Sequence, residues 1–142
     1  MAATMMFWPM FGMAALTAVA WVVMGKRRQA AVRSKAMRLD DFSGRGEAPM
    51  APEVSVSTRH FANHFEVPLL FHVACLAHLA LGVVNLFAVA LAWVFVVLRA
   101  LHMREHLGPN RVMRRFNLYF LSTASMWLLW LHLAGWLLFS AG

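Results

Sequence analysis

The sequence predicts an all-α membrane protein that forms a bundle of four transmembrane helices. Of its 142 residues, 61% are hydrophobic and only 13% are charged. Soluble domains are about 45–50% apolar and about 25% charged, so this composition excludes an ordinary soluble domain. The length suits one domain, residues 1–142, with four spans of about 20 residues each.

Four apolar runs define the expected spans. The first is followed directly by Lys26-Arg27-Arg28, whereas a signal peptide carries its basic residues before the apolar core, so we expect it to be retained. The turn at 82–85 is short and predicts an antiparallel hairpin, and Gly108-Pro109-Asn110 separates the last two runs. We expect spans at residues 5–24, 60–83, 86–106 and 116–139, and a cytoplasmic loop over residues 26–58.

The basic residues predict the orientation of these spans. All 13 lysines and arginines lie in the two longer connections or at the adjoining helix ends, whereas the N-terminal tail, the turn at 82–85 and the C-terminus carry none. Cytoplasmic connections concentrate Lys and Arg, so both termini are expected on the non-cytoplasmic side. The net charge of +7 is explained in this way, and we expect no nucleic-acid partner.

Polar residues interrupt the start of the second span. At helical spacing, Arg59, Asn63 and Glu66 fall on one face. A charged side chain at membrane depth is costly and needs a partner or a function. The three side chains could clamp a zwitterionic ligand that carries a carboxylate; alternatively, Glu66 pairs with Arg99 and joins two helices. Pro68 is tolerated in membrane helices and carries little information alone.

The third span carries a second polar face formed by Arg99, His102 and His106. His60/His64 and His102/His106 are two i, i+4 pairs, which is the spacing of helical metal or haem ligands. No HExxH motif or cysteine cluster accompanies them, and His60 is expected near the wet surface, so the sequence predicts no metal site.

The remaining isolated polar residues favour packing roles. We expect interhelical hydrogen bonds from His72, His78 and His132, which lie among apolar residues. Cys75 lies mid-span with no basic neighbour, so we interpret it as an inert packing residue.

The four-span plan, with Arg59-x3-Asn63-x2-Glu66 and Arg99-x2-His102-x3-His106, resembles the MAPEG family (membrane-associated proteins in eicosanoid and glutathione metabolism). Asn110 and the arginines after it resemble the small bacterial members. The resemblance implies a homotrimer in a bacterial inner membrane, with a site between neighbouring subunits near the cytoplasmic side. It also implies glutathione as cosubstrate.

Residue roles follow from the same resemblance. It implies that Arg59, Asn63 and Glu66 contact glutathione and that Arg114 or Arg115 promotes its thiolate. We add Arg99, His102, His106 and Arg111 to the expected binding residues. Eicosanoid-type members carry tyrosines where His102 and His106 stand, and the connection after the third span aligns only with a shift, so Arg111, Arg114 and Arg115 stay rivals.

Two functions are compatible with these features. The first is a glutathione-dependent transferase or peroxidase that acts on lipophilic electrophiles. The second is a non-catalytic lipid-binding or accessory subunit of a larger membrane complex, which uses the same groove. A histidine-bound metal or haem is a third and weaker alternative.

Overall fold

The computed structural model describes residues 2–43 and 49–140, so residues 44–48 of the predicted loop lie outside the described residues. All secondary-structure elements of the described residues are helices and none is a strand, which confirms the predicted all-α class. Its elements are α1 (Ala2–Arg33), η1 (Leu39–Ser43), α2 (Pro52–Ala62), η2 (Asn63–Phe65), α3 (Val67–Ala80), α4 (Leu86–Leu107) and α5 (Val112–Ser140), where η marks a short 3₁₀ helix.

Three of these helices are long and apolar enough to cross a membrane: α1, α4 and α5. By contrast, α3 has 14 residues and is therefore about 21 Å long. The hydrocarbon core of a bilayer is about 30 Å thick. A further crossing between α1 and α4 therefore requires α2, η2 and α3 placed end to end.

The expected second span, residues 60–83, is not one continuous helix. The backbone leaves helical geometry at Glu66, with φ −98° and ψ −106°, and α3 restarts at Val67. Pro68 supplies the physical reason: it lacks an N–H, and its ring excludes the carbonyl of the residue four positions earlier from a helical bond. Pro68 therefore marks the break, although it was expected to carry little information alone.

The first helix is longer than the span predicted for it. The span was expected over residues 5–24, and α1 continues beyond it to Arg33 and has 32 residues. Lysine, arginine, glutamine and alanine are good helix formers, so the basic stretch continues the helix beyond the apolar run. Arg27 Nη2 donates a hydrogen bond to the carbonyl of Leu107 at 2.7 Å, which ties this extension to the end of α4.

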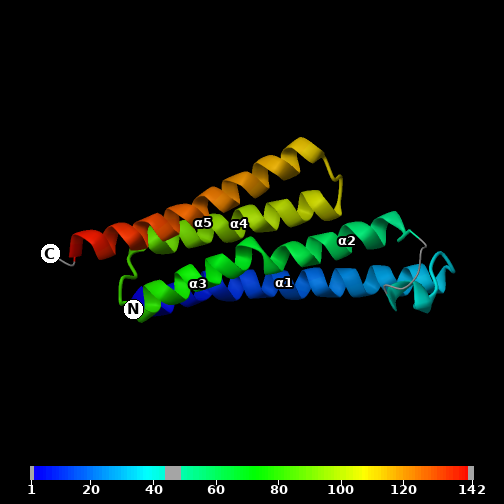
Figure 1. Ribbon diagram of the computed structural model, residues 1–142, viewed down its shortest axis with the longest axis horizontal. Helices are drawn as coiled ribbons and strands as arrows, with labels where there is room; N and C mark the ends of the chain where they lie inside the picture. Colours follow the sequence, from blue (N-terminus) through cyan, green and yellow to red (C-terminus); the bar gives the residue numbers. More distant parts are fainter. Residues whose placement is uncertain (1, 44–48, 141–142) are drawn as a thin grey trace.

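The helices form an elongated bundle (Figure 1). Helix α1 packs against α2, α3 and α4, and α5 packs along α4. The end of α1, the start of α2 and the α4–α5 connection lie at one end, whereas the start of α1, the α3–α4 turn and the end of α5 lie at the other (Figure 1). This arrangement agrees with the topology expected from the basic residues; the side of the membrane that each end faces stays a prediction.

A mainly apolar core holds the non-basic half of the bundle together. The rings of Phe71 and Phe95 stack with centroids 4.3 Å apart, and Cys75 is completely buried beside them, as a packing residue would be. His78 Nε2 on α3 and His132 Nδ1 on α5 are 3.0 Å apart, which confirms the expected interhelical hydrogen bond for this pair.

Candidate functional site

A cavity of about 590 Å³ opens between α2, α4 and α5 in the basic half of the bundle. This volume lies in the range typical of small-molecule sites. Its lining combines basic, amide, imidazole and hydroxyl groups with an apolar wall. The polar residues are Ser55, Arg59, Asn63, His102, His106, Asn110, Arg115 and Tyr119, and the apolar ones are Met50, Pro52, Val56, Val112 and Phe116.

Helix α2 and η2 bring two of the three predicted motif residues into this cavity. Arg59 is exposed within it, and its Nη2 donates a hydrogen bond to Ser55 Oγ at 3.0 Å. Asn63 lies one turn later and also lines the cavity. Glu66 follows the helix break, is exposed, and does not line the cavity. The expected common face therefore holds for Arg59 and Asn63 but not for Glu66.

Arg99 is buried at the base of this region, with 1% of its surface exposed. Its Nη2 donates to the backbone carbonyl of Asn63 at 3.1 Å, and its guanidinium lies 5.5 Å from the ring centroid of Tyr119. Its Nε and Nη1 atoms have no hydrogen-bond partner. Glu66 and Arg99 are not among the direct ion pairs of residues 2–43 and 49–140, although the Glu66 carboxylate acts on the Arg99 guanidinium electrostatically.

Arg115 lies in the first turn of α5, and the connection before this helix holds its side chain in position. Asn110 adopts a left-handed backbone conformation with φ +54°, which asparagine tolerates better than most residues. Its Oδ1 accepts a hydrogen bond from Arg115 Nη1 at 2.7 Å. Both side chains line the cavity, so Asn110 positions a guanidinium there.

The other two candidate arginines line a different, smaller cavity of about 380 Å³. Arg111 forms a two-point contact with Glu105: Nε lies 2.9 Å from Oε1, and Nη2 lies 3.2 Å from Oε2. These hydrogen bonds raise the pKa of Arg111 above its ordinary value. Arg114 lines the same smaller cavity. The structure thus separates three arginines that the sequence left as equal rivals.

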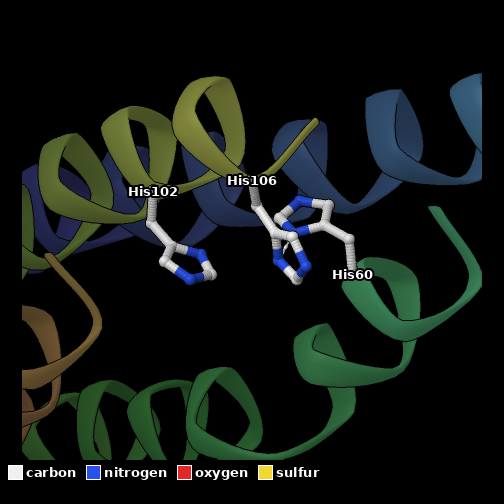
Figure 2. Close-up of side chains that lie close together, drawn as sticks. All are labelled: His60, His102 and His106. Carbon is white, nitrogen blue, oxygen red and sulfur yellow. Dashed lines mark hydrogen bonds between the residues drawn. The ribbon is translucent and has the colours of Figure 1, made fainter. Parts of the chain in front are cut away.

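Three histidines converge beside the larger cavity (Figure 2). One ring nitrogen from each of His60, His102 and His106 lies within 4.8 Å of the other two. His102 and His106 project side by side from α4, and His60 reaches toward His106 from α2 (Figure 2). His60 is only 1% exposed, so the expectation that it lies near the wet surface is wrong.

Ser55 and Tyr119, which line the cavity, and His60, which lies beside it, were not among the predicted binding residues. Tyr119 lies four residues after Arg115 on one helix, so the spacing alone places both on the same face. His60 belonged to an i, i+4 histidine pair whose partners on α4 were also noted. Helical spacing therefore indicates which residues share a face of one helix. It does not reveal which faces of separate helices meet.

Comparison with known proteins supports one family. The sequence model of the MAPEG family matches residues 6–135, which is nearly the whole chain. Searches of curated proteins and of solved structures found no match.

Proposed function

Because the chain belongs to the MAPEG family, we propose that it is a membrane-embedded, glutathione-dependent transferase or peroxidase whose substrates are lipophilic electrophiles. The observation that carries the proposal is the basic, amide-rich cavity between α2, α4 and α5. Its hydrogen-bond donors can bind carboxylates, and one of its guanidinium groups can stabilise a thiolate. Its apolar wall can contact a lipophilic substrate.

In the proposed complex, Arg59 and Asn63 bind the polar part of glutathione. The guanidinium of Arg59 is exposed in the cavity and can pair with a carboxylate through two parallel hydrogen bonds. Asn63 offers both a donor and an acceptor to peptide groups. Glu66 lies outside the cavity of its own chain, and we assign it to the amino group of a glutathione bound between neighbouring subunits of a homotrimer.

Arg115 is the residue that we assign to thiol activation. A cation next to a thiol favours the anion and lowers the thiol pKa. Among the three candidate arginines, Arg115 alone lines the larger cavity, and the hydrogen bond to Asn110 fixes its position. Arg111 and Arg114 line the other cavity, and Arg111 is already paired with Glu105.

The thiolate then acts as a nucleophile. In conjugation, its sulfur forms a bond to an electrophilic carbon, and the leaving group departs with its electron pair. In peroxide reduction, the sulfur attacks the O–O bond, which releases an alcohol after protonation and leaves a sulfenic acid on glutathione. A second glutathione condenses with it to give the disulfide and water, so two thiols supply the two electrons.

The test measures glutathione binding and turnover by the full chain purified in detergent. We expect binding in the wild type, consumption of an activated aryl halide or a lipid hydroperoxide, and weaker binding in Arg59→Ala and Glu66→Ala. Arg33→Ala is the matched control, because this arginine ends α1 away from the cavity lining. Unchanged binding in both Arg59→Ala and Glu66→Ala, or a tightly bound lipid with no glutathione binding, contradicts the proposal and supports a non-catalytic lipid-binding role.

A further inference from the structure

We propose that His60, His102 and His106 form a binding site for a divalent transition-metal ion of the zinc class. This inference goes beyond the proposed function and does not depend on it. The sequence predicted no metal site, because no metal motif joins the two histidine pairs. The fold supplies what the sequence lacked, since it brings a ring from α2 against two rings from α4 (Figure 2).

The spacing of the rings fits tetrahedral coordination. Zinc binds imidazole nitrogen at about 2.0–2.1 Å, so two nitrogens in a tetrahedral site are about 3.3 Å apart. The Nδ1 atoms of His60 and His106 are already 3.2 Å apart. The ring nitrogen of His102 lies within 4.8 Å of the other two. It therefore has to move by no more than about 1.5 Å to reach the tetrahedral spacing, and a rotation of the side chain is enough for this.

His102 provides an independent indication of a missing ligand. It is 2% exposed, and its Nδ1 atom is buried without any hydrogen-bond partner. A buried polar atom that loses its water without gaining a hydrogen-bond partner destabilises the folded chain. A metal ion bound to Nδ1 removes this deficit.

A chain of hydrogen bonds that begins on α1 orients the ring of His60 and sets its tautomer for metal binding. Thr17 Oγ1 donates its single proton to the carbonyl of Met13 at 3.1 Å, so it accepts from His64 Nδ1 at 3.0 Å. His64 Nε2 then accepts from His60 Nε2, 3.3 Å away. In the neutral ring this leaves His60 Nδ1 with a lone pair directed at the cluster. This lone pair accepts a hydrogen bond from His106 Nδ1, 3.2 Å away, and a metal ion would replace the proton between these two nitrogens. Such outer partners typically fix the tautomer and orientation of metal-binding histidines.

The choice of metal follows from the ligands. Three neutral imidazoles suit zinc, copper, nickel or iron and disfavour magnesium and calcium, which require oxygen ligands. His102 and His106 also line the larger cavity, so the fourth coordination position faces it. Arg59 and Arg115 line the same cavity, which favours an anionic fourth ligand such as hydroxide or a thiolate.

Metal binding is measured on the full chain without a polyhistidine tag, after treatment with a chelator and in the absence of glutathione. Co²⁺ serves as the optical probe because its ligand-field absorption reports four-coordinate nitrogen sites. We expect a single Co²⁺ per chain, displaced by Zn²⁺. His60→Ala and His106→Ala should lower the affinity about 100-fold or more, and Thr17→Val should lower it about tenfold by releasing His64. His72→Ala, outside the cluster, is the control and should bind normally.

A second measurement needs no variant. A ligand that binds only the folded chain raises its Tm, so Zn²⁺ should raise the Tm of the wild type, whereas Mg²⁺ should not. Absence of Co²⁺ binding overturns the proposal, as does full binding in His60→Ala and His106→Ala or an equal loss in His72→Ala. Both measurements are made without glutathione. A negative result therefore contradicts the metal site but not the proposed glutathione chemistry.

Discussion

Arg99 on α4 donates a hydrogen bond from Nη2 to the backbone carbonyl of Asn63, 3.1 Å away at the start of η2. The carbonyls near a helix break lack their usual partners, so a buried side-chain donor satisfies one of them. The contact therefore fixes the break between α2 and α3 against α4 and sets the position of Asn63 at the cavity.

Replacing Arg99 by methionine tests this role. Arg99→Met keeps much of the buried volume but leaves the Asn63 carbonyl without its charged donor, so we expect a loss of about 1–3 kcal/mol in the free energy of unfolding. Chemical unfolding in detergent measures the change. A variant more stable than the wild type contradicts this role. It would mean that the free-energy cost of burying the guanidinium is larger than the stabilisation from its hydrogen bond.

The histidine pair between α3 and α5 should stabilise the opposite half of the bundle. His132 lies 3.0 Å from His78 and 2.9 Å from Asn85 through its two ring nitrogens. Hydrogen bonds between membrane helices contribute about 0.6–2 kcal/mol. We expect His132→Ala to lower stability by about that amount and His72→Ala to lower it less, as measured by thermal unfolding. Equal losses in the two variants would show that only packing is involved.

The all-helical plan of the chain could be predicted because each expected crossing has a local signal. The apolar runs, the basic connections and the Gly82–Asn85 turn each depend on residues that are close in sequence. Gly82 indeed has φ +68°, which glycine adopts readily, and Asn85 caps α4 by accepting from the backbone N–H of Ala88. The break before α3 was missed because its cause, Pro68, acts in some membrane helices and is absorbed in others.

The candidate site was only partly predictable for a different reason. Helical spacing shows that His102 and His106 share a face, but it does not show that His60, 46 positions before His106, meets them. Adjacent residues can also separate: Arg114 and Arg115 line different cavities because successive positions on a helix point about 100° apart. Such relationships depend on the packing of several helices.

Arg111 should have a structural role rather than a catalytic one. Its pKa is raised by the hydrogen bonds to Glu105, so it stays protonated throughout the neutral range. A raised folded-state pKa contributes stability below the unfolded value and loses it only as the pH rises through the folded value. We therefore expect Arg111→Ala to lower the Tm slightly and by the same amount at neutral and mildly alkaline pH. Glutathione binding should be unchanged, and a loss of binding would return Arg111 to the site.

The most direct test of the account compares the two neighbouring arginines by the ultraviolet absorbance of the glutathione thiolate bound to the purified chain. The wild type and Arg114→Ala should both produce the thiolate signal, whereas Arg115→Ala should lose it, because only Arg115 lines the cavity to which we assign the thiol. A signal that survives in Arg115→Ala and disappears in Arg114→Ala, or no thiolate in the wild type, contradicts the account.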